Sequence, residues 1–152
     1  MAIAVGQPAP EFTLKDQDQK EIKLSDYRGK NVVILFYPLD WSPVCTDEHA
    51  RFMSSLGQFE KLNAQVLGLS VDSHWSHKAF AEKMGVAYPL LADFQPRGAV
   101  ADQFGVYHAD KGITGRAIII IDQAGKVAWL KRYGFGDVPD KKEVAQALAQ
   151  LK

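Results

Sequence analysis

The stretch that decides the fold reads Val32-Val33-Ile34-Leu35-Phe36-Tyr37, followed by Pro38-Leu39-Asp40-Trp41-Ser42-Pro43-Val44-Cys45. Its first part is continuously apolar and rich in branched and aromatic residues. Such a run is typical of a strand that is buried on both faces in the middle of a sheet. Pro38 ends the predicted strand, because proline cannot donate a hydrogen bond to a sheet.

A helix is predicted directly after Pro43. Two acidic residues come early in this segment, as expected near the positive end of a helix dipole. Apolar residues then recur at helical spacing, at Phe52, Leu56, Phe59 and Leu62. This pattern places Cys45 in the first turn of the helix.

The chain continues outward from this unit with a second strand and a second helix. The apolar run Val66–Val71 predicts a strand, and a strand-helix-strand order of this length implies parallel neighbours joined by a right-handed crossover. The next helix is predicted to end at Gly85, a favourable C-cap, and to place four residues on one side: His77, Phe80, Ala81 and Met84.

Shorter elements are predicted in the second half of the chain. Leu90–Ala92 reads as a brief strand, and Gly98–Phe104 as a short helix closed by Gly105. The runs Ala117–Ile121 and Lys126–Tyr133 are joined by four turn-forming residues, which predicts a hairpin and makes part of the sheet antiparallel.

The last helix is predicted from a capping box and an apolar stripe. Asp140 is followed three positions later by Glu143, the spacing of a capping box. The buried stripe would consist of Val144, Leu148 and Leu151.

These elements predict the α/β class, with a mixed central sheet flanked by helices. A thioredoxin-like fold requires this arrangement, although other α/β folds remain open from the pattern alone. The 152 residues match the size of one domain, so a single domain over residues 1–152 is expected.

The amino-acid composition limits which binding partners and which cellular compartment are expected. The 18 basic residues balance the 18 acidic ones and form no run, which argues against nucleic acid and acidic membrane surfaces. No secretory signal and no apolar segment of roughly 18 residues, as a membrane span needs, is recognisable. A single cysteine cannot form a bridge within the chain, which fits a reducing compartment, so a cytoplasmic location is expected.

Cys45 is the candidate reactive residue. A lone cysteine is more often a small buried hydrophobic residue than a nucleophile. Here, however, the first turn of a helix directs backbone N–H groups and the positive end of the dipole at the sulfur, which favours the thiolate. The preceding strand end places Cys45 at the carboxyl edge of the sheet, where α/β folds form their crevices.

The same residues carry a resemblance to the peroxiredoxins. Pro38, three residues, Ser42, two residues and Cys45 match that family's motif of Pro, Thr or Ser, and Cys. Similar residues also fall where the family has them elsewhere in the chain: Phe36-Tyr37, Glu48, Leu69–Ser73 and Arg116. The resemblance covers essentially the whole chain.

The resemblance implies a site with Cys45 as the peroxidatic thiolate. Attack on one peroxide oxygen pushes negative charge onto the other, so a cation and hydrogen-bond donors are needed. Arg116 would supply a permanent charge and a fork of donors, and the Ser42 hydroxyl can both donate and accept. The backbone N–H groups of Val44 and Cys45 would add donors, and Pro38 would limit solvent access to the thiolate.

Glu48 has two possible roles. It would orient Arg116 through an ion pair, or it would only complement the helix N-terminus as a first-turn acid. The pattern alone does not decide between them.

The chain departs from commoner peroxiredoxins in ways that concern its mechanism. Ala50 stands where some members carry a resolving cysteine, and no second cysteine follows. The chain is therefore similar to the short one-cysteine group of the alkyl hydroperoxide reductase E type. Ser42 replaces the more usual Thr, which keeps the hydroxyl but loses a methyl group that restricts its rotamers.

The expected activity is a thiol-dependent peroxidase that acts on hydrogen peroxide and/or organic hydroperoxides. A Cys45 sulfenic acid would be reduced by an external thiol, either a thioredoxin- or glutaredoxin-like protein or a small thiol. No cofactor and no metal are expected. The resemblance also implies a homodimer.

The sequence also contains features of other kinds of site and function. Glu48 stands where a dithiol oxidoreductase needs its second cysteine, so that class is excluded. His74 and His77 lie at helical spacing but lack a third metal ligand, which favours a capped helix start or satisfied surface histidines. The remaining alternative is a non-catalytic thioredoxin-fold protein in which Cys45 senses oxidation or only packs in the core.

Two short motifs do not meet the requirements of the sites that they resemble, and the first of them is more typical of a turn. Asp16-Gln17-Asp18 resembles the opening of a calcium loop, but Glu21 stands where that loop needs glycine. Gly134-Phe135-Gly136 lacks the third glycine and the strand-to-helix context of a dinucleotide site.

Overall fold

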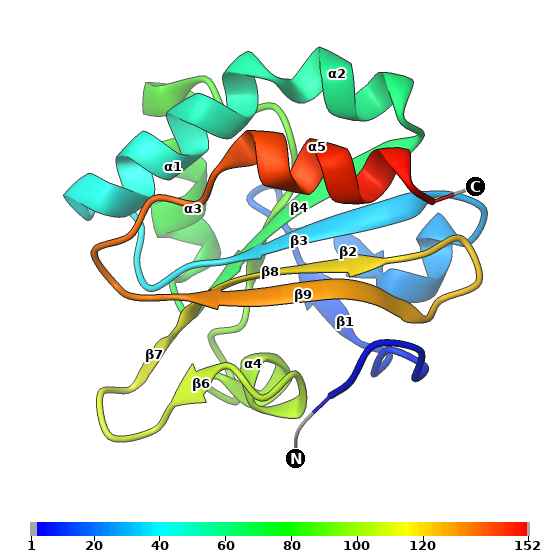
Figure 1. Cartoon of the computed structure of the whole chain (residues 1–152). Helices are drawn as coiled ribbons and strands as arrows, with labels where there is room; N and C mark the ends of the chain where they lie inside the picture. Colours follow the sequence, from blue (N-terminus) through cyan, green and yellow to red (C-terminus); the bar gives the residue numbers. More distant parts are fainter. Residues whose placement is uncertain (1–2, 152) are drawn as a thin grey trace.

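A computed structural model describes residues 3–151, and its centre is a mixed five-stranded sheet (Figure 1). The strand order is β5-β4-β3-β8-β9. β3 pairs in parallel with β4, and β4 with β5, whereas β8 runs antiparallel to both β3 and β9. The bounds are β3 Asn31–Phe36, β4 Ala64–Ser70, β5 Leu90–Ala92, β8 Arg116–Ile121 and β9 Val127–Tyr133. The predicted fold class, the parallel neighbours and the hairpin are confirmed.

The middle strand β3 is buried on both faces because its alternate side chains enter two different cores. Val33 and Leu35 pack with the helices on one face of the sheet. Val32, Ile34 and Phe36 pack into the core on the other face. An uninterrupted apolar strand at the centre of the sheet follows from this double burial.

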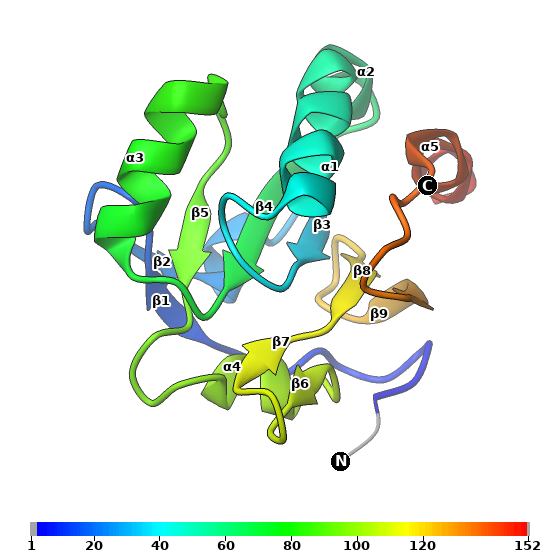
Figure 2. The same ribbon diagram turned by 90° about the vertical axis from the view of Figure 1, so that its left-hand side faces the viewer.

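Four helices cover one face of the sheet (Figure 2). Their bounds are α1 Pro43–Ser54, α2 Leu56–Lys61, α3 His74–Met84 and α5 Lys141–Ala149. α3 begins after Ser73, whose Oγ accepts a hydrogen bond from the Ser76 amide at 3.2 Å. It ends at Gly85, which adopts a left-handed conformation with φ of 68° and confirms the predicted C-cap.

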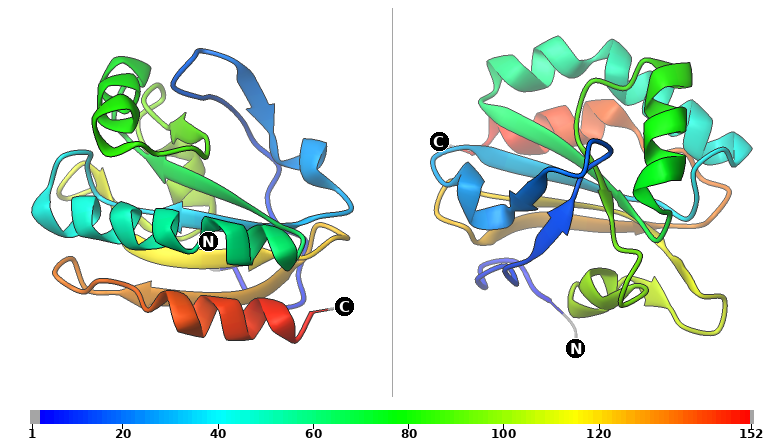
Figure 3. Two further views of the ribbon diagram at one scale, coloured as in Figure 1. Left: turned by 90° about the horizontal axis from the view of Figure 1, so that it is seen from above. Right: turned by 180° about the vertical axis from the view of Figure 1, so that it is seen from behind.

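The opposite face is covered by short elements, of which the sequence pattern predicted only the short helix, expected over Gly98–Phe104 (Figure 3). They are β1 Thr13–Lys15, β2 Glu21–Lys23, the 3-10 helix η1 Leu24–Tyr27, α4 Ala99–Gln103, β6 Tyr107–His108 and β7 Ile113–Thr114. Asp16 lies in the turn between β1 and β2, and its Oδ1 accepts hydrogen bonds from the amides of Asp18 and Lys20. The interpretation of this segment as a turn is confirmed.

Two details of the helix predictions are wrong. The helix after Pro43 is interrupted at Ser55, which leaves the helical conformation and begins α2. Phe52 and Phe59 nevertheless stack on each other at 5.7 Å, so the apolar spacing continues across the break and conceals it.

The second error concerns the start of α5. Asp140 caps it, accepting from the Lys142 amide at 2.9 Å. Glu143 does not complete a capping box, because both its oxygens accept hydrogen bonds from Lys131 on β9, at 2.8 and 2.9 Å.

No helix within residues 3–151 combines the length and the apolar character that crossing a membrane would require.

Candidate active site

Cys45 is the third residue of α1 and lies just beyond the carboxyl end of β3. Ser42 is the N-cap and Pro43 takes the first helical position, where its missing N–H is not needed. The Thr46 amide donates to the Ser42 carbonyl at 2.9 Å and closes the first turn. The thiol is fully buried. The predicted position of Cys45 in the first turn is confirmed.

Arg116 reaches the sulfur from the neighbouring strand. It is the first residue of β8, and the antiparallel pairing of Phe36 with Ala117 brings that start beside the end of β3. The Arg116 Nη2 atom lies 3.3 Å from Cys45 Sγ. The side chain is almost completely buried, so its charge acts on the sulfur with little screening by water.

Two acceptors hold the Arg116 guanidinium in place. Nη1 donates to Glu48 Oε1 at 2.5 Å, and Nη2 donates to the Phe135 carbonyl at 2.9 Å. Glu48 comes from α1, one turn after Cys45, whereas Phe135 follows β9. The ion pair to Glu48 is present, which is the first of the two roles that the sequence left open.

Burial shifts the pKa of the carboxyl group in this ion pair. It raises the pKa of Glu48 to about 7, although the Arg116 charge and hydrogen bond act to lower it. Oε2 of Glu48 has no hydrogen-bond partner within residues 3–151, which leaves it available to carry a proton. When Glu48 is protonated, the Arg116 charge is not neutralised and can act fully on the sulfur.

The other predicted site residues lie along the loop that leads into α1. Pro38 is buried directly after β3, and Val44 precedes Cys45 in the first helical turn. The Ser42 hydroxyl donates to the Leu39 carbonyl at 3.2 Å. The structure therefore brings Arg116 into direct contact with the sulfur and Glu48 into contact with Arg116, whereas Ser42 directs its hydroxyl to the loop backbone.

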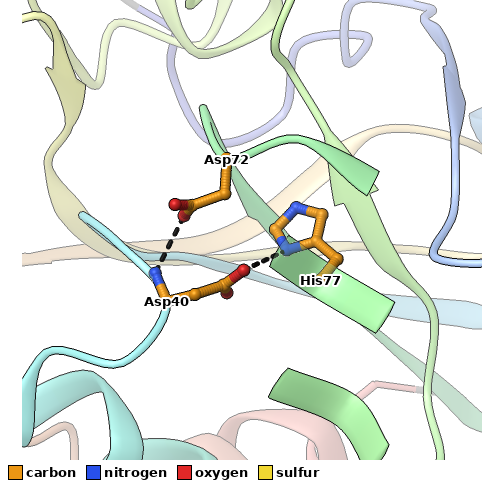
Figure 4. Close-up of side chains that lie close together, drawn as sticks. All are labelled: Asp40, Asp72 and His77. Carbon is orange, nitrogen blue, oxygen red and sulfur yellow. Dashed lines mark hydrogen bonds and ion pairs between the residues drawn. The ribbon is translucent and has the colours of Figure 1, made fainter. Parts of the chain in front are cut away.

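Asp40, in the middle of this loop, forms a cluster with Asp72 and His77 (Figure 4). One side-chain atom of each lies within 4.8 Å of the others, a spacing that a metal ion could use. However, the His77 ring nitrogens face Asp40 Oδ2 at 2.8 Å and the Leu91 carbonyl at 3.1 Å. Asp40 and Asp72 also accept hydrogen bonds from neighbouring groups. The donor set therefore fits a closed hydrogen-bond network better than a metal centre.

Sequence reasoning missed two parts of this site. The Phe135 carbonyl lies in the Gly-Phe-Gly segment that was interpreted only as a failed dinucleotide motif, and a backbone acceptor leaves no side-chain signal. His77 is fully buried, so its interpretation as a surface histidine is wrong. Its position on the apolar side of α3, beside Phe80 and Ala81, was the available signal of burial.

Comparison with known proteins finds similar sequences over nearly the whole chain. Residues 5–130 match the model of the AhpC/TSA family. Alkyl hydroperoxide reductase E of Mycobacterium tuberculosis is 37% identical over 98% of both chains. Peroxiredoxin-2 of Bos taurus is 41% identical over 95% of this chain and 75% of its own length.

Solved structures show the same fold. AhpC of Enterococcus faecalis superposes with a TM-score of 0.89 and 30% identity, over 98% of this chain and 92% of its own. Peroxidoxin BcpB of Mycobacterium tuberculosis gives 0.87 and 28%, over 99% of each chain. With its single cysteine at the head of α1, the chain belongs to the AhpC/TSA family, the peroxiredoxins.

Proposed function

We propose that this protein is a thiol-dependent peroxidase that reduces hydrogen peroxide and/or organic hydroperoxides with Cys45. The observation that carries the proposal is the 3.3 Å contact between the Arg116 guanidinium and the sulfur of the chain's one cysteine. A buried cation at this distance stabilises a thiolate, which is the reactive form of cysteine.

The reaction proceeds by attack of the Cys45 thiolate on one peroxide oxygen. An S–O bond forms as the O–O bond breaks, and the leaving oxygen takes the electron pair. It also takes up a proton, equivalent to the one that the thiol released on ionisation, and departs as water or an alcohol. Negative charge develops on that oxygen in the transition state, where the Arg116 N–H groups and the amides at the start of α1 stabilise it. Cys45 is left as a sulfenic acid.

An external thiol then restores the enzyme. A first thiol condenses with the sulfenic acid to give a mixed disulfide and water, and a second displaces Cys45 as thiolate. Both must come from outside, since the sequence contains one cysteine. A thioredoxin- or glutaredoxin-like protein or a small thiol has the required chemistry.

The remaining site residues have supporting roles in this proposal. Glu48 orients Arg116, and the Val44 amide adds a donor at the start of α1. Pro38 shields the sulfur from water. The Ser42 hydroxyl binds the peroxide after a rotation away from the Leu39 carbonyl, which accepts it in the structure described here.

We also propose that the protein forms a homodimer in the cytoplasm. The family relationship supports the dimer, and the single cysteine fits a reducing compartment. Sedimentation that finds only monomers at working concentration would contradict the dimer.

The decisive experiment is stopped-flow tryptophan fluorescence with hydrogen peroxide, followed by mass spectrometry of Cys45. Trp41 is half exposed, lies four residues before Cys45 and packs edge-on against Phe80, so it reports changes near the sulfur. A fast second-order signal with one oxygen added to Cys45 is expected, and Arg116→Ala should abolish the fast phase. Arg51→Ala, which removes an exposed arginine from α1, is the control and should react like the wild type.

A wild-type rate no better than that of a free thiol would overturn the peroxidase proposal. The non-catalytic reading would then apply, and Cys45 would be a slow sensor or a packing residue. Complete burial of the thiol is the observation that favours this second candidate.

A further inference from the structure

The loop before α1 is held by one buried carboxylate. Asp40 is only 6% exposed. Its Oδ1 accepts from the Tyr37 hydroxyl at 2.6 Å, and its Oδ2 accepts from Ser76 Oγ at 2.9 Å and faces His77 Nδ1 at 2.8 Å. Three side chains thus converge on the middle of the segment that joins Pro38 to Ser42.

His77 connects this carboxylate to the edge of the sheet. Its Nε2 faces the Leu91 carbonyl of β5 at 3.1 Å, and Figure 4 shows the ring beside Asp40. Both ring nitrogens face acceptor oxygens, and only the imidazolium form donates from both. Burial acts to raise the pKa of Asp40, but the hydrogen bond and charge of His77, together with the hydrogen bonds from Tyr37 and Ser76, hold that pKa below its usual value.

Asp72 fixes the backbone of the same loop. Its Oδ2 accepts from the Asp40 amide at 2.8 Å and from Ser70 Oγ at 2.6 Å. The loop is therefore bonded to the end of β4 through its main chain, and to α3 and β5 through the Asp40 side chain.

The loop adopts a backbone conformation that it would not prefer alone. Trp41 has a φ of 73°, in the left-handed region that a residue with a bulky side chain rarely occupies. Such strain persists only where the surroundings hold it. The bonds to Asp40 act on the residue before Trp41, and Phe80 contacts the Trp41 ring.

The backbone of Arg116 is positioned independently of this loop. It belongs to β8, and the guanidinium is bonded to Glu48 and to the Phe135 carbonyl. Alignment of the sulfur with the cation therefore depends on how accurately the loop sets the start of α1. A displacement of about 1 Å from reacting geometry can cost about 100-fold in rate.

We propose that Asp40 and His77 are positioning residues that set the reaction rate of Cys45 with peroxide by fixing the Pro38–Ser42 loop and the first turn of α1 relative to Arg116. This inference rests on the proposed peroxidase function. Neither residue is placed in contact with peroxide, and both act through the loop.

The test compares two reactions of the same sulfur in Asp40→Asn. The second-order rate with hydrogen peroxide needs the aligned site and should fall about 10- to 100-fold. Alkylation by iodoacetamide needs the thiolate but not the peroxide geometry, so its rate, measured at a pH high enough to ionise the thiol in both proteins, should stay the same or rise as the loop opens. His77→Gln keeps one N–H donor and should lose less peroxide reactivity than His77→Leu.

Asp93→Asn is the matched control. Asp93 is equally buried, accepts hydrogen bonds from the Val100 and Ala101 amides at 3.1 and 2.9 Å, and lies outside the loop network. It should lower the melting temperature but leave the peroxide rate within about 2-fold of the wild type. A general loss of stability is thereby separated from a loss of positioning.

Three results would overturn the positioning role: an unchanged peroxide rate in Asp40→Asn, an equal fall in both reactions, or an equal effect of Asp93→Asn. If Asp40→Asn does not fold, Ser76→Ala and His77→Gln carry the same comparison, since each removes less of the network. Failure of the peroxidase proposal itself is distinguishable, because the wild type would then already react with peroxide like a free thiol.

Discussion

At the scale of single residues, the reactivity of Cys45 depends on how the Arg116 charge is shared. The guanidinium faces a sulfur on one side and a carboxyl group on the other. The protonation of Glu48 therefore affects the sulfur together with the distance from Arg116 to it.

Glu48→Gln should flatten the dependence of stability on pH. The pKa of Glu48 is about 7 in the folded protein against an ordinary value of 4.5, so between these values the folded state holds a proton that the unfolded chain has released. Raising the pH through this window therefore lowers the free energy of unfolding. Urea unfolding of the reduced proteins should show a shallower decline for Glu48→Gln.

Comparing how steeply the free energy of unfolding falls with pH in Glu48→Gln and in the wild type separates the contribution of Glu48 from that of other titratable groups. Burial also raises the pKa of Asp72 and of Asp93, but both titrate in the variant and in the wild type alike. Parallel slopes in the two proteins would show that Glu48 is ionised throughout the window.

Arg116→Lys should react with peroxide more slowly than the wild type but faster than Arg116→Ala. Lysine keeps a positive charge near the sulfur. It lacks the planar guanidinium that donates both to Glu48 and to the Phe135 carbonyl. Stopped-flow rates on the three proteins check this order. If Arg116→Lys equals the wild type, charge alone is sufficient and the fork is not needed.

The side chains of this site were largely predictable, whereas its backbone partner was not. Cys45 was identified from its place in a sequence motif and Arg116 from the family resemblance, and the contact between them agrees with both. The Phe135 carbonyl carries no side-chain signal. Asp40 and His77 lie 37 positions apart, and only the folded sheet brings them together.

At the scale of elements, the close packing of β4 against its neighbours explains a glycine in a buried strand. Gly68 pairs with Leu35 on one side and Leu90 on the other. A Cβ atom there would lie 2.6 Å from Leu90 Cδ2 and 3.4 Å from the rings of His49 and Tyr37. The site therefore has no room for a methyl group without movement of buried side chains.

Gly68→Ala should destabilise the protein by about 1–3 kcal/mol, the usual cost of overpacking a core. Gly57→Ala is the matched control, since a Cβ on this α2 residue meets no atom within 4 Å. It should instead add roughly 0.5–1 kcal/mol by restricting the unfolded chain and favouring the helix. Urea unfolding of both variants measures the difference, and equal stabilities would refute the packing argument.

The elements with long apolar patterns were recognised from the sequence, and so were the short strand β5 and the short helix α4, whereas the two-residue strands were missed. β3 and β8 are six-residue strands with five consecutive apolar residues each, and both were recognised as strands. β6 and β7 have two residues each, too few to show any alternation. The break at Ser55 was hidden because apolar spacing continues through it.

At the scale of the whole molecule, the order of the strands could not be predicted from pattern. β8 inserts beside β3 although more than 80 residues separate their starts, and such pairings depend on the packing of both sheet faces. The expected single domain over residues 1–152 stays a prediction. Unfolding followed by far-ultraviolet circular dichroism and by tryptophan fluorescence should give one coincident transition, and two separate transitions would contradict it.

Excess peroxide without a reductant should inactivate the protein. With one cysteine in the chain, no internal disulfide can protect the sulfenic acid. Mass spectrometry of the Cys45 peptide should show one added oxygen at one equivalent of peroxide and two at high excess, as sulfenic acid becomes sulfinic acid. Adding a thiol together with the peroxide should prevent the second step, and a second oxygen that appears at the same rate with thiol present would argue against this scheme.

The late position of β8 in the chain also has a consequence for synthesis. Cys45 leaves the ribosome long before Arg116 and Phe135, which lie 71 and 90 positions further on. If Arg116 activates the sulfur as proposed, a nascent or truncated chain carries an unactivated cysteine that peroxide oxidises slowly. The reactive thiol would then arise only in a finished fold, so the protein would be protected from its own substrate while it is being made.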